Sequence, residues 1–292
     1  MTLSFGERLA AAFASTGRLC VGIDPHSYLL GQWQLSDDAK GVRDFGLRVV
    51  EATAGRAGII KPQVAFFERH GSAGYAALED VLAAARDAGL LVIADVKRGD
   101  VGTSVEAYGE AWLTPGSPLE ADAMTISAFQ GVGSIDAPHT LALAHGKGLF
   151  VLAATSNPEA ASLQTARLTI ADTATTTVAA SIVSDVHDWN TLEITAGASS
   201  VVRAGLGSTG VVIGATVALD DYGITPPALA NTPILAPGFG HQGALVSDAT
   251  RLFGAASANV IVSASRSILT AGPDGIAAAI DTQAAEIAGA FA

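Results

Sequence analysis

Eight short apolar runs recur along the chain, each bounded by turn residues and separated from the next by a longer, alanine-rich segment. Several runs are apolar at consecutive positions, as at Leu91, Val92 and Ile93, which is typical of strands buried on both faces of a parallel sheet. The runs span residues 19–24, 58–62, 90–97, 123–128, 148–155, 210–216, 233–238 and 259–265. The pattern therefore predicts eight parallel strands.

The segments between the runs carry apolar residues at helical spacing. Positions 78, 81, 82 and 85 follow the i, i+3, i+4, i+7 pattern, and Gly89 ends this helix just before the third run. The same spacing appears within 42–49 and from Pro273 onward, where the last helix is expected. Strands alternating with helices favour an α/β fold, the (β/α)8 TIM barrel, with one helix before the first strand. An open, doubly wound sheet gives the same alternation with fewer strands and remains an alternative.

The length and the connections indicate a single domain. The 292 residues lie near the upper limit for one hydrophobic core, and no linker rich in Pro, Gly or Ser divides them. The segment 159–209 is long for one crossover and rich in Thr and Ser, so we expect an elaborated region of loop and helix there. We therefore predict one domain over residues 1–292.

Composition limits the classes of partner. The sequence has 16 Lys and Arg against 28 Asp and Glu, a net charge of −12, with 49% hydrophobic and 15% charged residues. Such a chain can bury a large core, which excludes intrinsic disorder. The acidic balance argues against a nucleic-acid polymer, which would attract clusters of Lys and Arg. A small anionic substrate remains compatible, because a local pocket can be basic within an acidic protein.

The single cysteine, Cys20, excludes an intramolecular disulfide, and its apolar surroundings predict a buried structural thiol rather than a nucleophile. No Cys and His spacing typical of zinc appears, so no metal is expected. No apolar stretch approaches the roughly 20 residues of a membrane helix. Glu7 and Arg8 precede only a short alanine-rich run, a poor layout for a signal peptide, so we predict a soluble cytoplasmic protein.

Polar residues and glycines gather where the predicted strands end. The carboxyl ends of barrel strands meet at one rim, where barrel enzymes place their chemistry. An ordinary surface position would explain one or two isolated charges, but six strand ends carry polar groups or glycines. These are Asp24, Lys61, Asp95 with Lys97, Thr155 with Ser156, Gly238 with Gly240, and Arg266. We therefore expect a functional site at this rim.

The motif 93–100 carries the densest charge. Asp95 and Lys97 are two residues apart and so point to the same side of a strand, while Asp100 follows in the loop. Lys61 comes from the neighbouring strand, which gives two positive and two negative charges that can form an alternating network. Unpaired, such charges would cost roughly several kcal/mol each when buried. The alternative is a solvated surface ion pair or a salt bridge that closes the barrel.

A glycine-rich loop and an arginine follow the last two strands. In the segment 237–243, Gly238 and Gly240 flank Phe239 and let backbone N–H groups approach an anion, and a helix is expected to begin after this loop. The guanidinium of Arg266 can grip two phosphate oxygens. The loops after strands seven and eight are the usual phosphate site of this barrel, so we expect phosphate binding here.

Two further polar residues have two interpretations each. Asp24 precedes Pro25 and either begins a turn or accepts hydrogen bonds from ribose hydroxyls. Ser156 either caps a helix or binds substrate. The sequence leaves both alternatives open.

Together these residues resemble the orotidine 5′-phosphate decarboxylase family, in its larger bacterial subgroup. The family motif Asp-x-Lys-x-x-Asp stands here as Asp95, Lys97 and Asp100, followed by Val101 where the family often has Ile. The resemblance extends from residues 22–25 through the motif to Arg266. It implies cofactor-independent decarboxylation of orotidine 5′-phosphate to UMP and CO2, the last step of de novo UMP synthesis.

The resemblance also implies roles for the charged residues. Lys97 is similar to the family's proton donor to pyrimidine C6, and Asp95 to the carboxylate beside the departing CO2. Lys61 matches the lysine that holds this aspartate and approaches the ribose. Asp100 matches an aspartate that crosses a homodimer interface into the partner's site, and Thr103 matches a nearby ribose contact.

Further positions are similar to the family's substrate ligands. Ser156 matches the ligand of the pyrimidine amide, and Gln242 and Arg266 match ligands of the phosphate. The segment 159–209 lacks a clear counterpart, so no functional residue is assigned there.

Three other functions remain as alternatives. An aldolase of the same barrel would use Lys61 or Lys97 as a Schiff-base lysine, although flanking carboxylates that keep Lys97 protonated disfavour an amine nucleophile. A metal-dependent sugar-phosphate synthase is a second alternative. A nucleotide-binding sensor without chemistry is the third, but binding alone does not require the full set of Lys and Asp.

Overall fold

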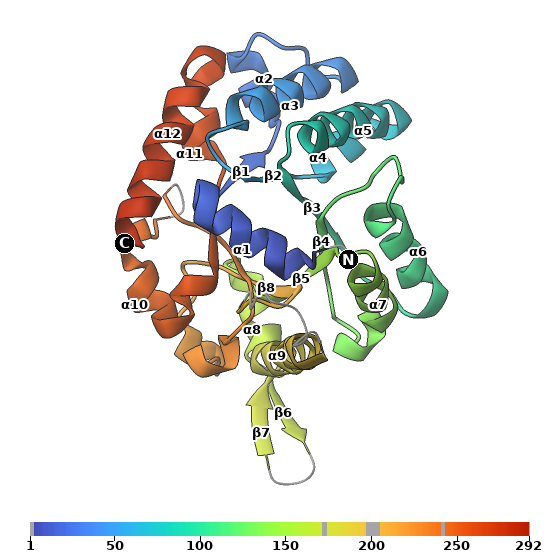
Figure 1. The fold of residues 1–292 in the computed structure, drawn as a ribbon, viewed down its shortest axis with the longest axis vertical. Helices are drawn as coiled ribbons and strands as arrows, with labels where there is room; N and C mark the ends of the chain where they lie inside the picture. The colour runs from blue at the N-terminus through green and yellow to red at the C-terminus, as the bar shows by residue number, and fades with distance from the viewer. Residues whose placement is uncertain (1–2, 171–173, 197–204, 241–242, 292) are drawn as a thin grey trace.

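Eight parallel strands close into a barrel in the computed structural model, which describes residues 3–170, 174–196, 205–240 and 243–291 (Figure 1). The barrel strands are β1 (Leu19–Ile23), β2 (Ile59–Pro62), β3 (Leu91–Arg98), β4 (Ala123–Ile126), β5 (Gly148–Ala154), β8 (Thr209–Ile213), β9 (Ile234–Pro237) and β10 (Val260–Ala264). The last strand pairs with the first in the register Leu19 to Val262 and Cys20 to Ser263. This closure confirms the predicted TIM barrel and excludes the open sheet.

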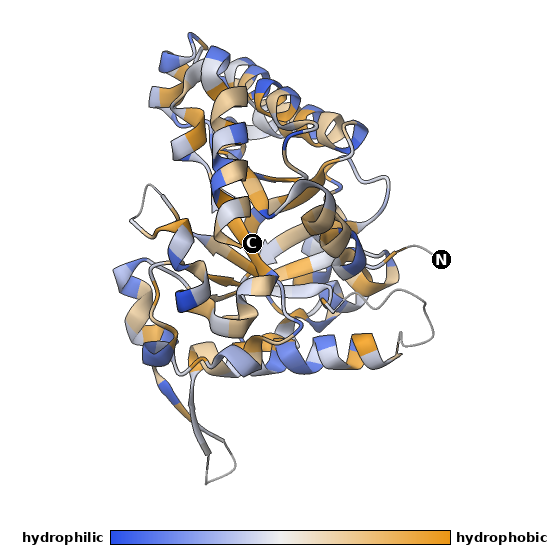
Figure 2. Ribbon diagram, turned by 60° about the vertical axis from the view of Figure 1, so that its left-hand side comes forward, coloured by the Kyte–Doolittle hydropathy of each residue, from blue (hydrophilic) through white to orange (hydrophobic). Residues whose placement is uncertain are grey.

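Helices surround the barrel, and those expected from spacing are present (Figure 1). They are α1 (Phe5–Thr16), α2 (Ser27–Gln32), α3 (Ala39–Thr53), α4 (Ala65–Glu68), α5 (Gly71–Asp87), α6 (Gly102–Leu113), α7 (Asp136–Ala144), α8 (Pro158–Gln164), α9 (Val178–Ala196), α10 (Ala249–Phe253), α11 (Arg266–Leu269) and α12 (Gly272–Ala290). Short 3-10 turns lie at η1 (Val132–Ile135), η2 (Leu219–Tyr222), η3 (Pro226–Leu229), η4 (Val246–Asp248) and η5 (Gly254–Asn259). Figure 2 shows hydrophobic residues concentrated along the central strands that these helices cover.

The long connection after β5 contains a β-hairpin that the sequence did not predict. The strands β6 (Arg167–Ile170) and β7 (Ala174–Thr177) pair antiparallel and project from the body of the molecule (Figure 1). Composition indicated a loop here, but threonine is β-branched and favours strands when a partner strand is adjacent. The expected helical part of the segment is present as α8 and α9.

Helix α1 closes the amino-terminal end of the barrel. A capping box starts it, in which Ser4 Oγ accepts the N–H of Glu7 at 3.2 Å and Glu7 accepts the N–H of Ser4 at 2.8 Å. Phe5 then packs edge-on against the barrel residue Phe150, with ring centroids 5.9 Å apart. Gly6 is required here, because a Cβ would lie 2.2 Å from the carbonyl oxygen of Leu206.

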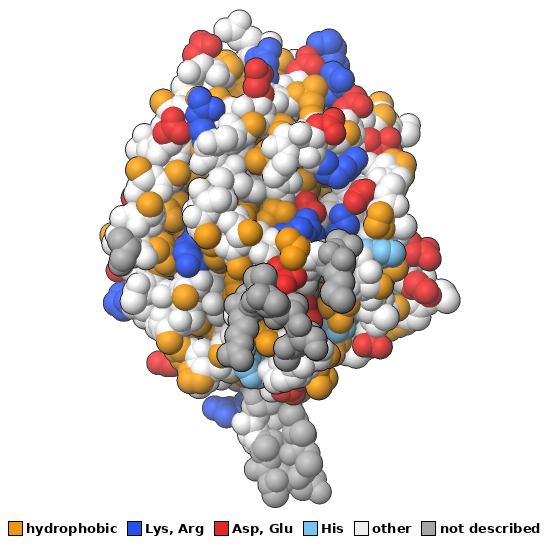
Figure 3. Space-filling model, in the orientation of Figure 1, with side chains coloured by type: hydrophobic (Ala, Val, Ile, Leu, Met, Phe, Trp, Pro, Cys, Tyr) orange, Lys and Arg blue, Asp and Glu red, His pale blue; other side chains and the backbone are white. Residues whose placement is uncertain are grey.

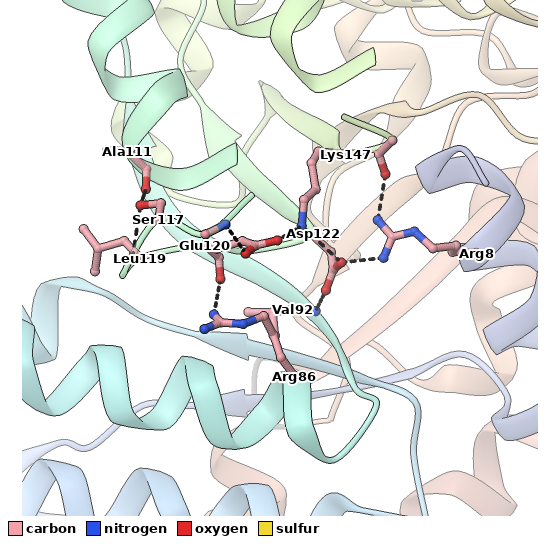
Figure 4. A network of polar contacts seen from close by, with 11 residues as sticks. Arg8, Arg86, Val92, Ala111, Ser117, Leu119, Glu120, Asp122 and Lys147 are labelled. Carbon is pink, nitrogen blue, oxygen red and sulfur yellow. Dashed lines mark hydrogen bonds and ion pairs between the residues drawn. The ribbon is translucent and has the colours of Figure 1, made fainter. Parts of the chain in front are cut away.

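An ion network ties α1 to the strand starts (Figure 4). Arg8 pairs with Asp122 and donates to the carbonyl of Gly146 at 2.7 Å. The buried Lys147 contacts Glu120 at 2.7 Å and Asp122 at 3.8 Å. These charges are paired at the end of the barrel where β4 and β5 begin, so their role is to hold the helix in place.

The described helices include none that is long and apolar enough to cross a membrane. On the face drawn in Figure 3, acidic and basic side chains are scattered among neutral ones. The net charge of −12 therefore does not make this face uniformly acidic.

We expect Phe5→Ala to lower the free energy of unfolding by about 3–5 kcal/mol, because it opens a cavity between α1 and the barrel interior. Urea denaturation monitored by circular dichroism measures the change. Leu3→Ala is the control, since Leu3 is 50% exposed just before the same helix. Equal unfolding midpoints for the two variants would contradict the role given to Phe5.

Candidate active site

A cavity of about 430 Å³ opens at the carboxyl ends of the barrel strands. Below it the barrel is filled by apolar side chains such as Ile93 and Phe150. Most of the predicted site residues line the cavity: Asp24, Lys61, Asp95, Lys97, Ser156, Gly238, Phe239 and Arg266. The volume is that of a pocket for a small molecule.

Three of the predicted residues that the structure describes, Asp100, Thr103 and Gly240, are not part of this lining. Asp100 and Thr103 lie on the loop after β3 and in the first turn of α6, and Asp100 Oδ1 accepts the N–H of Val101 at 2.9 Å. No contact joins Asp100 to Lys97 among the described residues, so the four-charge network expected from the sequence has three members within one chain. Gly240 lies in the loop after β9 outside the lining, and Gln242 lies outside the described residues.

Asp95 is the centre of the three-charge network. Its Oδ2 accepts from Lys61 Nζ at 2.8 Å, and its Oδ1 accepts from Lys97 Nζ at 2.5 Å. Asp95 and Lys61 are each only 7% exposed, whereas the side chain of Lys97 is 46% exposed and reaches into the cavity. The alternative of a solvated surface pair is therefore wrong for the Lys61 and Asp95 pair.

Lys97 reaches this position because the β3 backbone leaves its regular ladder. Ala94 pairs with Met124, and the next pair is Arg98 with Ile126. Between these two pairs β3 advances by four residues while β4 advances by only two, so β3 contains a bulge. Lys97 itself has a φ of +48°, which is rare for a residue with a side chain. Such bulges re-aim side chains next to active sites. The two-residue period of a strand correctly predicted that Lys97 lies on the same side as Asp95. It did not predict the bulge in β3.

The network reverses the effect of burial on both buried charges. Burial alone would raise the pKa of Asp95, but the ammonium groups of Lys61 and Lys97 outweigh it and hold that pKa well below its usual value. Burial would likewise lower the pKa of Lys61, but the carboxylates of Asp95 and Asp24 outweigh it and raise that pKa. Both groups are therefore charged at neutral pH.

Cys20 lies deeper in the barrel and is fully buried. Burial raises the pKa of its thiol to about 12, although the charge of Lys61 partly opposes this shift. The prediction of a buried structural thiol is confirmed.

Two residues that hydrogen-bond to Asp95 were not predicted. Gln63 Nε2 donates to Asp95 Oδ2 at 3.1 Å, and Thr125 Oγ1 donates to Asp95 Oδ1 at 2.9 Å. Both line the cavity. Gln63 stands two positions after Lys61, and Thr125 is a polar residue inside an apolar run, which are the signals that could have identified them.

Asp24 takes part both in a turn and in the cavity. Its backbone carbonyl accepts the N–H of His26 at 2.8 Å, while Ser265 Oγ donates to its Oδ2 at 2.5 Å. The buried Oδ1 has no hydrogen-bond partner among the described residues. A carboxylate oxygen in a cavity without a donor suits a ligand hydroxyl.

The glycine-rich loop and Arg266 lie on one side of the cavity. Gly238 and Gly240 have φ values of +114° and +74°, conformations that glycine adopts without strain. The expected helix does not follow directly, because the turn η4 comes first and α10 begins only at Ala249. Arg266 and the neighbouring residues Ser265 and Ser267 line the cavity. Arg266 and the loop residues Gly238 and Phe239 thus line the same cavity, whereas the start of α10 does not.

Ser156 lines the cavity and is not the cap of the following helix. The residue at the N-cap position of α8 is Asn157. Within the described residues, no group of three or more His, Cys, Asp or Glu side chains is arranged to hold a metal ion.

A closed barrel of eight parallel strands with a polar cavity at their carboxyl ends is the architecture of a (β/α)8-barrel enzyme. Residues 17–280 match the sequence model of the orotidine 5′-phosphate decarboxylase / HUMPS family, and the chain belongs to this family.

Relatives match over nearly the whole chain. The orotidine 5′-phosphate decarboxylase of a Nocardioides strain is 49% identical over 269 residues, which is 91% of this chain and 92% of the relative. That of Corynebacterium efficiens is 42% identical over 293 residues, 99% of each chain.

Solved structures show the same similarity. A candidate orotidine 5′-phosphate decarboxylase from Streptomyces avermitilis has a TM-score of 0.88 and 43% identity over 99% of this chain and 96% of its own. The Leishmania donovani OMP decarboxylase has a TM-score of 0.75 and 26% identity over 99% and 100%.

We expect Asp95→Asn to lower the free energy of unfolding by about 3–5 kcal/mol at pH 7, because it leaves the buried Lys61 without its counter-charge. The pKa of Asp95 is lowered in the folded state, so its contribution is present above the ordinary carboxyl pKa. The difference between wild type and variant is therefore expected to shrink as the pH falls below about 4.

Urea denaturation at several pH values measures this difference. Asp44→Asn is the matched control, because Asp44 pairs with the exposed Lys40 at 2.6 Å. Its expected loss is about 0–1 kcal/mol. A loss for Asp95→Asn no larger than that of the control would show that the buried pair does not stabilise the fold.

Proposed function

We propose that this chain converts orotidine 5′-phosphate to UMP and CO2 without a cofactor, as the last step of de novo UMP synthesis. The observation that carries the proposal is the Lys97 ammonium, paired with the Asp95 carboxylate inside a cavity of nucleotide size. Membership of the family and the names of its relatives support the same reaction. The proposal takes residues 1–292 as one catalytic domain.

Lys97 is the proton donor in this reaction. The bond from pyrimidine C6 to the carboxylate carbon breaks, CO2 leaves, and the electron pair stays on C6. A proton from the Lys97 ammonium then forms the C6–H bond, and the lysine regains a proton from solvent. Its ion pair with Asp95, at 2.5 Å, suits an ammonium rather than the neutral amine that a Schiff-base enzyme requires.

One charge cannot lower the whole barrier. Two unit charges 4 Å apart interact by about 4 kcal/mol at an effective dielectric constant of 20, whereas enzymes lower barriers by about 8–23 kcal/mol. The remainder comes from groups fixed before the reaction begins and from binding energy at the phosphate. The buried Lys61 and Asp95 are such fixed charges.

The other predicted residues each bind one part of the nucleotide. Arg266 and the loop of Gly238, Phe239 and Gly240 bind the phosphate, Asp24 accepts from the ribose hydroxyls, and Ser156 binds the pyrimidine amide. Arg266 and Asp24 both line the cavity, which supports this division. Gln242, the other phosphate ligand in the proposal, lies outside the described residues.

We place the active form as a cytoplasmic homodimer, in which Asp100 and Thr103 of one subunit complete the site of the other. Both residues lie outside the cavity of their own chain, and Thr103 is exposed. Val101 and Phe129, on the loops after the adjacent strands β3 and β4, are 52% and 73% exposed. Exposed apolar residues beside the site support a subunit contact there.

We expect Lys97→Ala to abolish nearly all turnover while nucleotide binding largely persists, because the variant removes the proton donor and leaves the phosphate ligands in place. The decrease in orotate absorbance measures turnover, and calorimetry with UMP measures binding. Wild-type turnover is expected to persist in EDTA, whereas a metal-dependent synthase would lose it. Near-normal turnover in Lys97→Ala would refute its assignment as the acid.

Arg266→Ala serves as the comparison in the same assay. It is expected to raise KM and lower kcat/KM, because it removes a phosphate ligand and not the acid. An unchanged KM and kcat/KM would mean that the phosphate binds elsewhere.

The shared site predicts complementation between inactive variants. Lys97→Ala and Asp100→Ala homodimers are each expected to be nearly inactive, but a heterodimer of the two contains one site with both native residues. Co-expression and random pairing should then restore about a quarter of wild-type activity. No recovery in a preparation shown to contain heterodimers would place Asp100 in the site of its own subunit.

A further inference from the structure

The hydroxyl of Thr125, at the carboxyl end of β4, lies between the backbone of Lys97 and the carboxylate of Asp95. The backbone N–H of Lys97 donates to Thr125 Oγ1 at 2.9 Å, and Thr125 Oγ1 donates to Asp95 Oδ1 at 2.9 Å. Thr125 is only 1% exposed and lines the cavity. One buried hydroxyl thus contacts both partners of the central ion pair.

The direction of both hydrogen bonds follows from the groups involved. A backbone amide can only donate, so the hydroxyl oxygen accepts from Lys97. An ionised carboxylate can only accept, so the single hydroxyl proton points to Asp95. A valine side chain at this position could make neither contact.

The carboxylate of Asp95 cannot accept further hydrogen bonds once these contacts are made. Its Oδ1 accepts from Lys97 Nζ and Thr125 Oγ1, and its Oδ2 accepts from Lys61 Nζ and Gln63 Nε2. Two donors on each oxygen use the lone pairs of the carboxylate and fix its plane. The ammonium of Lys97 therefore rests on a carboxylate that cannot rotate freely.

The backbone of Lys97 depends on Thr125 in a second way. At the bulge in β3, Lys97 leaves the regular strand pairing and has a φ of +48°. Its N–H therefore has no regular ladder acceptor and donates to the Thr125 hydroxyl instead. Thr125 therefore fixes the backbone of Lys97, from which the side chain extends, and also the carboxylate of Asp95, which the Lys97 ammonium contacts.

We propose that Thr125 is a positioning residue for the reaction, which holds the Lys97 ammonium in the place where it protonates the substrate. This inference rests on the proposed decarboxylation. Thr125 acts through Lys97 and Asp95 and not on the reacting atoms. The phosphate and ribose ligands lie on other strands, so its loss should affect the chemical step more than binding.

The test compares Thr125→Val, which has the shape of threonine without the hydroxyl, with Thr125→Ser, which keeps it. For Thr125→Val we expect kcat to fall about 10- to 100-fold, because small displacements of a reacting group have effects of this size. The KM for orotidine 5′-phosphate should stay within about threefold of wild type. Thr125→Ser should recover most of kcat. Thr282→Val, on the exposed face of α12, controls for the substitution itself.

Hydrogen exchange of the Lys97 amide gives a readout independent of activity. Exchange should be faster in Thr125→Val than in wild type and slow again in Thr125→Ser, with unfolding midpoints in urea confirming that each variant is folded. A wild-type enzyme inactive on orotidine 5′-phosphate would refute the proposed function, and the exchange pattern would then decide the role of the hydroxyl alone.

Three results would overturn the inference. The first is a kcat for Thr125→Val equal to that of wild type. The second is a Thr125→Ser variant as impaired as Thr125→Val, which would mean that the methyl group and not the hydroxyl matters. The third is an effect confined to KM, which would assign Thr125 to binding.

Discussion

The structure of the site depends on one buried carboxylate. Asp95 is largely buried, and an isolated charge there would be strongly unfavourable. Four donors from three adjacent strands and their ends compensate for that cost: Lys61 belongs to β2 and Gln63 follows it, Lys97 belongs to β3, and Thr125 belongs to β4. These hydrogen bonds form only when the three strands lie side by side in their observed register. The reactive centre is therefore assembled when the barrel folds.

The barrel interior has two layers of different polarity. The lower layer is apolar and contains Phe150 and Cys20, with α1 closing it from below. The upper layer carries the charges and opens into the cavity. An apolar floor beneath Lys61 and Asp95 limits the water that could screen them, which keeps their interaction strong at the place where the substrate's charge changes.

The sequence predicted the barrel, its eight strands and eight of the residues that line the cavity, because these follow from local patterns: apolar runs, helical spacing, and polar residues at strand ends. It did not predict the bulge at Lys97, which depends on the pairing of two strands and has no local signature. Gln63 and Thr125 were overlooked because neutral polar residues become informative only when a charge is seen beside them. The hairpin β6–β7 was read as a loop, since composition does not reveal which segment supplies a partner strand.

Closure of the barrel has a consequence for how the molecule assembles during synthesis. β1 pairs with β10, so residues near position 20 find their partners near position 262, and Arg8 reaches Asp122 and the carbonyl of Gly146. Contacts between such distant parts of a chain form slowly. One edge of the first strand therefore stays unpaired until residues 260–264 have been synthesised, which exposes that edge to neighbouring nascent chains throughout that interval.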